Sequence, residues 1–285
     1  MSCYHPLRAY RRVGGRDPVT GKWPLTFKKS EGWLETAIDI PCGTCVGCRM
    51  DYARGWALRC VHESKLHKDN CCITLTYDDD NLPDDGELDK RGMQNWLKIL
   101  RYHIGSFRYF GCGEYGKMGD RPHYHIILFG YDFPDKRLIT THLGTKQYDS
   151  AMLRDIWHRG HISVGQVDFR TAAYIARYCL KKQKGGDNRH QQQEYILMSN
   201  RPGIGADWVK QFSSDVFSAG RIVTTNGNYK VPKYYEGKLD QIDHERFVEY
   251  KRGHDVELVS PLRAAQQEIV KKERLKDFKR SFEDV

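Results

Sequence analysis

The sequence predicts an α+β fold, with a central antiparallel sheet and helices packed on one face of it. Segments rich in aromatic and β-branched residues have the length of strands at 71–78, 107–116, 123–129 and 160–168. The short, glycine-containing turn at 117–120 would join two of these strands as a hairpin. Apolar residues recur at helical spacing in 93–105 and 170–183. These patterns place a sheet in the middle of the chain, with helices around it.

The flanking regions are less regular. An amphipathic helix is predicted over 48–67, and Ser260-Pro261 has the character of a helix start that opens a charged C-terminal helix. Between 194 and 250 no periodic pattern dominates. We therefore expect three parts, which are a cysteine-rich segment and helix packed on the core (1–70), the core (71–185) and a C-terminal extension with the charged helix (186–285).

Charge and hydropathy narrow the class of protein. The 285 residues include 46 Lys or Arg and 37 Asp or Glu, a net charge of +9, which favours a polyanionic partner. No run of about 18 apolar residues is present, so we expect no membrane span. The N-terminus lacks the apolar core of a secretion signal, so we expect a protein of the cytoplasm.

Two histidines one residue apart are the first candidate for chemistry. In the strand "HYHIILF", side chains alternate faces, so His123 and His125 share one face and Tyr124 turns to the other. Two neutral imidazoles side by side suit a divalent metal, although a polar strand face with two ordinary histidines would look the same. If the hairpin closes around 117–120, Glu114 falls near the level of His123 and adds a carboxylate, or else it is a solvated strand residue. An open site of this kind suits Mg²⁺ or Mn²⁺ acting on a phosphodiester.

Two tyrosines on the helix predicted over 170–183 are the second candidate. Tyr174 and Tyr178 are four residues apart and stack on one helix face, with Lys181 and Lys182 in the next turn. A tyrosine can be a covalent nucleophile, but the pKa of its hydroxyl is near 10. A cation that polarises the phosphate, or a nearby lysine, would therefore lower the barrier to attack. The alternative is a half-buried structural stripe.

The order of these features resembles the HUH endonucleases, in which a tyrosine nicks single-stranded DNA. The blocks "PCGTCVGCRMDYARGWALRC", "GEYGKMGDRPHYHIILFG", "AAYIARYCLKK" and "LMSNRPGIGADW" are similar to the replication initiator proteins of gokushovirus-type microviruses, which are small single-stranded DNA phages. The similarity covers residues 1–235. It implies an HUH-like fold, single-stranded DNA at the viral origin as substrate, host replication machinery as partner and the host bacterial cytoplasm as location.

The resemblance also assigns roles by position. It implies that His123, His125 and Glu114 hold the catalytic cation, with Glu114 on the preceding strand as the acidic ligand. Tyr174 and Tyr178 match the paired tyrosines of the phage initiators, and Lys182 matches their nearby lysine. The strand "CCITLTY", with Thr74, Thr76 and Tyr77, matches a structural motif beside the DNA cleft.

The cysteines suggest a second metal. Cys42, Cys45 and Cys48 have CxxCxxC spacing, and a fourth ligand from Cys3 or His5 would complete a Zn²⁺ site. An iron–sulfur cluster or free thiols are the alternatives. The other five cysteines lie in core-like patterns and are expected to be buried thiols, namely Cys60, Cys71, Cys72, Cys112 and Cys179.

The sequence therefore predicts a metal-dependent DNA nicking and joining enzyme. One competing reading is a zinc-stabilised nucleic-acid-binding protein without catalysis, which would not need the Glu, His and Tyr set. Another is a cupin-like metal enzyme, which also carries two histidines on a strand. Cupins place a glutamate three or four residues after the pair, where this chain has Leu128 and Phe129.

Overall fold

The computed structural model describes residues 3–19, 21, 23–116, 119–142, 145–178, 192–224, 227–252 and 260–280, apart from the side chains of 142, 145, 177, 178, 261 and 275–280. The chain divides into two compact units, and each is described by itself. The first comprises residues 1–51 and 256–285, and the second comprises residues 52–255. The domain boundaries predicted at residues 70 and 185 stay a prediction.

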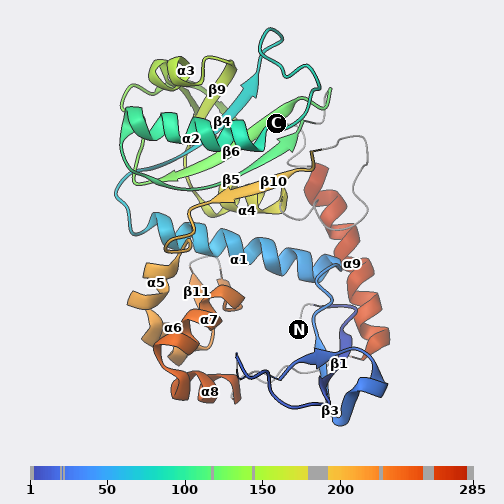
Figure 1. Ribbon diagram of the computed structural model, residues 1–285. Helices are drawn as coiled ribbons and strands as arrows, with labels where there is room; N and C mark the ends of the chain where they lie inside the picture. Colours follow the sequence, from blue (N-terminus) through green and yellow to red (C-terminus); the bar gives the residue numbers. More distant parts are fainter. Residues whose placement is uncertain are drawn as a thin grey trace. The chain divides into compact units, whose positions relative to one another are not determined.

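A seven-stranded antiparallel sheet forms the centre of the second unit, in the order β10-β5-β6-β4-β9-β8-β7 (Figure 1). Its strands are β4 (Asn70–Tyr77), β5 (Arg108–Tyr115), β6 (Pro122–Phe129), β7 (Arg137–His142), β8 (Thr145–Asp149), β9 (Gly160–Gly165) and β10 (Tyr195–Met198). The predicted α+β class with a central antiparallel sheet is confirmed. Four of these strands, β4, β5, β6 and β9, match the four predicted strand segments.

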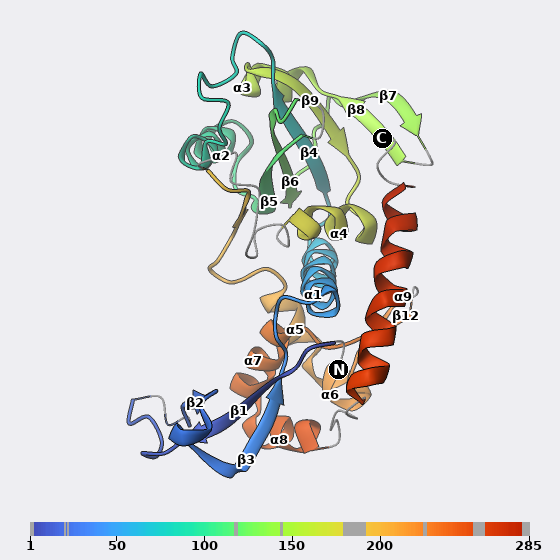
Figure 2. The same ribbon diagram turned by 90° about the vertical axis from the view of Figure 1, so that its right-hand side faces the viewer.

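Helices cover both faces of this sheet (Figure 2). One face packs against α2 (Lys90–Ile104) and α3 (Ala151–Trp157), and the other against α1 (Val46–Ser64) and α4 (Phe169–Tyr178). The prediction that only one face is covered is wrong. The second face is apolar over part of its length, through Cys72, Phe110, Ile127 and Phe129, and this part must also be buried.

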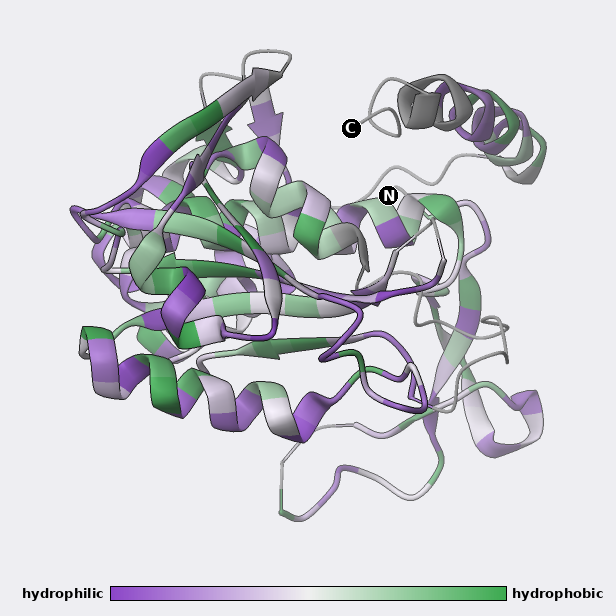
Figure 3. Cartoon of the chain, turned by 90° about the horizontal axis from the view of Figure 1, so that it is seen from above, coloured by the Kyte–Doolittle hydropathy of each residue, from purple (hydrophilic) through white to green (hydrophobic). Residues whose placement is uncertain are grey.

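Helix α2 shows how the first face is built. Its buried residues are Met93, Trp96, Leu97 and Leu100, at the spacing of one helix face, while most of its exposed residues are polar (Figure 3). Asp89 caps the helix, because its carboxylate accepts a hydrogen bond from the Gly92 N–H at 2.7 Å. The helix over 93–105 was thus predicted correctly, and the cap places its start three residues earlier.

The segment 194–250, which lacked a dominant pattern, forms a third apolar cluster with Leu58 of α1. Its short elements are α5 (Ala206–Gln211), α6 (Ser213–Ala219), β11 (Ile222–Thr224), β12 (Gly227–Tyr229), α7 (Lys233–Ile242) and α8 (His244–Arg252). The "RPGIG" loop holds this region against the sheet. The Arg108 guanidinium donates to the Pro202 carbonyl at 2.8 Å, and the buried Glu63 carboxylate accepts from the Gly205 N–H at 2.6 Å.

The first unit contains a three-stranded antiparallel sheet in the order β2-β1-β3. Its elements are β1 (Leu7–Arg12), β2 (Leu25–Thr26), the 3-10 helix η1 (Lys29–Glu31), β3 (Gly32–Ile40) and the C-terminal helix α9 (Pro261–Arg280). The predicted start of α9 at Ser260-Pro261 is confirmed, whereas no strand was predicted between residues 7 and 40. Within the described ranges, no helix is both long and apolar enough to cross a membrane.

Candidate active site

A polar end of the sheet gathers the predicted site residues of β4, β5 and β6. His123 lies between Thr76 on one neighbouring strand and Glu114 on the other. His125 lies one step further along, opposite Thr74. Residues opposite one another on adjacent strands project to the same face. The structure therefore brings Glu114, His123 and His125 together on one face, in the hairpin register that the sequence predicts.

Glu114 is buried with an unsatisfied oxygen. Its side chain is only 5% exposed, and Oε1 lies 2.9 Å from Nε2 of His125. Oε2 is also buried, and no hydrogen-bond partner for it lies within the described part of the chain. A buried carboxylate oxygen without a donor is costly, and a cation would satisfy it. One carboxylate and two imidazoles are a donor set whose chemistry fits Mn²⁺ or Mg²⁺. Their ligand atoms do not all lie within 4.8 Å of one another, so a bound cation would require the side chains to move closer together.

Two threonines of β4 hold the histidine rings. The Thr74 hydroxyl lies 2.9 Å from Nδ1 of His125, and the Thr76 hydroxyl lies 2.9 Å from Nδ1 of His123. Nδ1 of each ring is thus engaged by the protein, so a cation would bind at Nε2, which in His125 lies 2.9 Å from Oε1 of Glu114. Burial lowers the pKa of His123, and the neighbouring His125 lowers it further. This shift favours the neutral imidazole, which is the form that binds metals.

Gly116 makes room for one of these rings. A Cβ atom at this position would lie 2.4 Å from Nε2 of His123, closer than any side chain could approach. Gly116 also closes the hairpin, because its N–H donates to the Arg121 carbonyl at 2.9 Å. The last residue of the "GEYG" motif is therefore a glycine because a side chain there would clash with the His123 ring.

Helix α4 places one predicted tyrosine beside the histidines. The ring of Tyr174 meets the ring of His125 edge-on, with centroids 5.5 Å apart and planes at 90°. Asp168 caps the helix, since its carboxylate accepts from the Thr171 N–H at 2.7 Å. Tyr178 lies one turn later on α4, but its side chain is outside the described residues, as is the whole of Lys182.

One histidine of the polar row was not singled out from the sequence. His161 on β9 lies opposite Thr76, so Glu114, His123, Thr76 and His161 form a row across four strands. A pocket of about 430 Å³ adjoins this end of the sheet, lined by Asp78, Ile139, Asp149, Arg154, Gly160, His161 and Ile162. The strand that carries His161, β9, was predicted from the sequence. The alternation of residues along a strand does not show which other strand it pairs with, so the pairing of β9 with β4 was not predicted.

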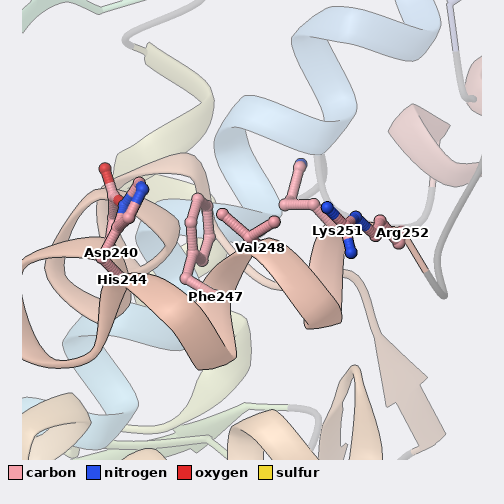
Figure 4. Close-up of a pocket in the computed structure, with 6 residues that line it drawn as sticks. All are labelled: Asp240, His244, Phe247, Val248, Lys251 and Arg252. Carbon is pink, nitrogen blue, oxygen red and sulfur yellow. The ribbon is translucent and has the colours of Figure 1, made fainter.

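A second hollow, of about 430 Å³, lies along α8 and the end of α7 (Figure 4). It is lined by Asp240, His244, Phe247, Val248, Lys251 and Arg252, none of which belongs to the histidine site. Three of its charged or titratable groups are already engaged by other side chains. His244 lies 2.7 Å from Asp240, and Lys251 lies 3.2 Å from Glu236. We assign it no role in catalysis.

The cysteine cluster is the candidate metal centre of the first unit. The Sγ atoms of Cys3, Cys42, Cys45 and Cys48 all lie within 4.8 Å of one another. Two of these sulfur pairs are 3.9 and 4.0 Å apart, near the edge of about 3.8 Å that four Zn–S bonds of about 2.3 Å would give. Cys3 is thus the fourth member of the cluster, and the cluster could bind a structural metal ion. His5, the alternative fourth ligand, instead lies 2.6 Å from Glu268.

Backbone N–H groups point at these sulfurs. Cys42 N–H donates to Cys3 at 3.3 Å, Cys45 N–H to Cys42 at 3.3 Å and Cys48 N–H to Cys45 at 3.5 Å. Burial raises the pKa of the Cys42 thiol, but the donors from the Cys45 and Thr44 backbone outweigh it and lower the pKa to about 6. Thiolate is the form that binds metal, whereas burial raises the pKa of the Cys3 and Cys48 thiols.

The remaining cysteines are thiols of the second unit. Cys60, Cys71, Cys72 and Cys112 are buried and lie outside any disulfide, as predicted. Cys179 lies outside the described residues.

Comparison with known proteins identifies the family. The family model for replication-associated proteins of the ORF2 kind matches residues 70–183, which span the strands and helix of the candidate site. Replication-associated protein VP4 of Bdellovibrio phage phiMH2K is 32% identical over 290 residues, covering 98% of this chain and 88% of its own. Replication-associated protein ORF2 of Spiroplasma virus 4 is 29% identical, covering 73% of this chain and 70% of its own.

Replication-associated protein ORF4 of Chlamydia phage 1 is 28% identical over 222 residues, covering 73% of this chain and 55% of its own. No solved structure matches the chain. The match to the Bdellovibrio phage protein extends over nearly the whole chain, and the family model falls on the strands that carry the polar row. The chain belongs to the family of microvirus replication-associated proteins.

Proposed function

We propose that this protein initiates rolling-circle replication by nicking and rejoining single-stranded DNA at the viral origin through a tyrosine, as HUH endonucleases do. The observation that carries the proposal is the contact of the Tyr174 ring with His125, which in turn binds Glu114. A tyrosine ring, two imidazoles and a buried carboxylate lie near one another at one end of the sheet, which supports the proposal. The names of the relatives support a role in replication.

The residues at this site would divide the work. Glu114, His123 and His125 would hold Mg²⁺ or Mn²⁺, which polarises the scissile phosphate when it is bound. The phenolic oxygen of Tyr174 or Tyr178 attacks the phosphorus, and a tyrosine–phosphorus bond forms as the bond to the 3′ oxygen breaks. The 5′ end stays on the tyrosine, and the 3′ oxygen leaves as a free hydroxyl that can prime a polymerase, so the proton lost by the tyrosine hydroxyl balances the proton gained by the 3′ oxygen. Lys182 would stabilise the phenolate.

Two tyrosines suit a reaction that must cut twice. After one round the regenerated origin is cut again while the first covalent link persists, so a single tyrosine would be occupied. Residues 174 and 178 are separated by about 6 Å along the helix axis, which is one turn of α4. Either hydroxyl could approach the same phosphate after a small rotation of the helix.

The rest of the chain would support this reaction. Zn²⁺ is the metal that four thiolates in a tetrahedral arrangement favour, so we assign Cys3, Cys42, Cys45 and Cys48 to structural zinc. The enzyme would work in the host bacterial cytoplasm. Host replication machinery would extend the free 3′ end of the nicked DNA.

A covalent-adduct assay tests the proposal. The protein is incubated with Mn²⁺ and a labelled single-stranded origin oligonucleotide, and the adduct is read as a shifted band on a denaturing gel. Tyr174→Phe and Tyr178→Phe should each keep some cleavage, and the double variant should form no adduct. His123→Ala and His125→Ala should abolish cleavage without unfolding the protein.

Tyr102→Phe is the matched control, because Tyr102 is 88% exposed on α2, on the other face of the sheet from α4. An adduct from the double variant would show that the nucleophile lies elsewhere. Binding of DNA without any adduct from the wild type would favour a nucleic-acid-binding protein without catalysis.

A further inference from the structure

The positive charge of this chain is concentrated in one short segment. Residues 7–30 contain seven Lys or Arg and one Asp, a net charge of +6, whereas the whole chain carries +9. This segment includes β1 and β2 and lies in the first unit, whereas every residue of the histidine site lies in the second. The charge therefore marks a surface that the proposed chemistry does not use.

Aromatic side chains accompany the charge on the small sheet. Arg11 on β1 lies opposite Leu25 on one side and Trp33 on the other, so the three side chains share one face. The Arg11 guanidinium also lies 5.7 Å from the ring of Trp23, two residues before Leu25. We call these four residues, Trp23, Leu25, Arg11 and Trp33, the Trp–Arg row.

This row is open to a ligand. Trp33 is 49% exposed and Leu25 is 44% exposed, a large apolar surface for residues of a sheet. Neighbouring arginines are already paired, because Arg8 lies 2.9 Å from Asp39 and Arg12 lies 3.8 Å from Glu31. Arg11 forms no ion pair with any residue that the structure describes, so its charge is available at the centre of the row.

We propose that the Trp–Arg row is a second binding surface for single-stranded DNA, separate from the nicking site. Unpaired bases stack on exposed aromatic rings, and basic side chains among those rings hold the phosphates. The net charge of +6 around the row favours a polyanion over a protein partner or a second copy of this chain. The choice of DNA rests on the proposed function, and such a surface would hold the strand on either side of a cut.

Binding without cleavage tests the inference. A fluorescent single-stranded 30-mer is titrated with full-length protein without added Mn²⁺, and the dissociation constant is read from anisotropy. Trp33→Ala should weaken binding about 5- to 100-fold, which is the range for loss of one stacking platform. Trp33→Phe should restore most of the affinity, since it keeps a ring. Arg11→Gln should reduce the slope of log Kd against log salt by about 0.7.

Leu34→Ala is the matched control, because Leu34 is the next residue of β3, is 60% exposed and points to the other face. Unchanged affinity for DNA in Trp33→Ala would overturn the proposal. A Trp33→Ala variant that changes the oligomeric mass of the protein and leaves its DNA affinity unchanged would also overturn it. Equal affinity for a duplex of the same sequence would also overturn it, because paired bases cannot stack on the rings. The adduct assay separates this inference from the proposed function, since a wild type that binds through Trp33 but forms no adduct would refute only the nicking.

Discussion

At the scale of single residues, two threonine hydroxyls contact Nδ1 of the two histidine rings and so orient Nε2 toward the position that a cation would take. Thr74 and Thr76 each lie 2.9 Å from a histidine Nδ1, so both rings are held in one orientation before any ion arrives. Ligands that are already oriented lose less conformational entropy on binding. The role of the strand "CCITLTY" is therefore more specific than lining a cleft.

Thr74→Val and Thr76→Val should weaken Mn²⁺ binding by about 10- to 100-fold, the usual effect of removing such a partner. Valine keeps the shape of threonine, so packing is preserved while the hydrogen bond to Nδ1 is lost. Isothermal titration with Mn²⁺ measures the change. Thr140→Val on β7 provides the control, because it alters an exposed threonine of the same sheet away from the histidines. An unchanged dissociation constant in both test variants would show that the hydroxyls are incidental.

The sequence could predict part of this arrangement. Alternation along a strand puts His123 and His125 on one face, and a short turn brings Glu114 level with them. It could not predict the threonine contacts, the space at Gly116 or the position of His161, because these depend on which strands pair and in which register. The pairing of β4 with both β6 and β9 is a long-range property.

At the scale of elements, α4 links the sheet to the proposed nucleophiles. The helix is only ten residues long in its described part, so its first turn is a large share of its stability. Asp168 caps that turn through the Thr171 N–H, and Ala172, Ile175 and Ala176 pack on the sheet. The cap and this apolar face together set where Tyr174 lies.

Asp168→Ala should cost about 1 kcal/mol of unfolding free energy, the usual value of a helix cap, and should slow adduct formation because Tyr174 is then held less firmly. Chemical denaturation and the adduct assay measure the two effects. Asp89→Ala is the matched control, since it removes an equivalent cap from α2 on the opposite face. If both variants slow the reaction equally, the loss reflects general destabilisation and not the placement of α4.

Helices and strands with a clear hydrophobic periodicity could be predicted from the sequence. Elements that lack such a periodicity could not be predicted. The strands of the core hairpin and α2 show clear periods of two and 3.6 residues. In contrast, β2 has two residues and the register between β1 and β3 shifts between Ala9 and Arg11, so the small sheet leaves little periodic signal. Helices α5 and α6 are six and seven residues long, and they are held by tertiary contacts such as Glu63 with Gly205.

At the scale of the whole molecule, the cysteine cluster closes the first unit. It brings Cys3, before β1, together with the segment that follows β3. A metal ion bound there would enclose the strands between in one cross-linked loop of about 40 residues. The His5–Glu268 contact adds α9 from the other end of the chain. A unit with a small sheet and little apolar core depends on such links for stability.

Purified protein should contain about one equivalent of zinc, and chelation should lower the melting temperature because metal binding contributes to folding. Elemental analysis and thermal melts with and without chelator test both points. Cys45→Ser should lose the metal, whereas Cys60→Ala, which alters a buried thiol outside the cluster, should keep it. Wild-type protein that is free of metal and melts normally would leave the cluster as plain thiols.

The unpaired oxygen of Glu114 has a consequence for the energy of the apo protein. A buried acceptor without a donor costs about 1–3 kcal/mol, and a cation bound by Glu114 would remove this penalty. By thermodynamic linkage, Mn²⁺ should then raise the melting temperature by RT ln(1 + [Mn²⁺]/Kd) divided by the unfolding entropy. Glu114→Gln should reduce that rise in calorimetry, since the amide offers the cation no charge while His123 and His125 remain as ligands. Selection for a cation-ready site would in this way have left the apo fold less stable than its packing allows.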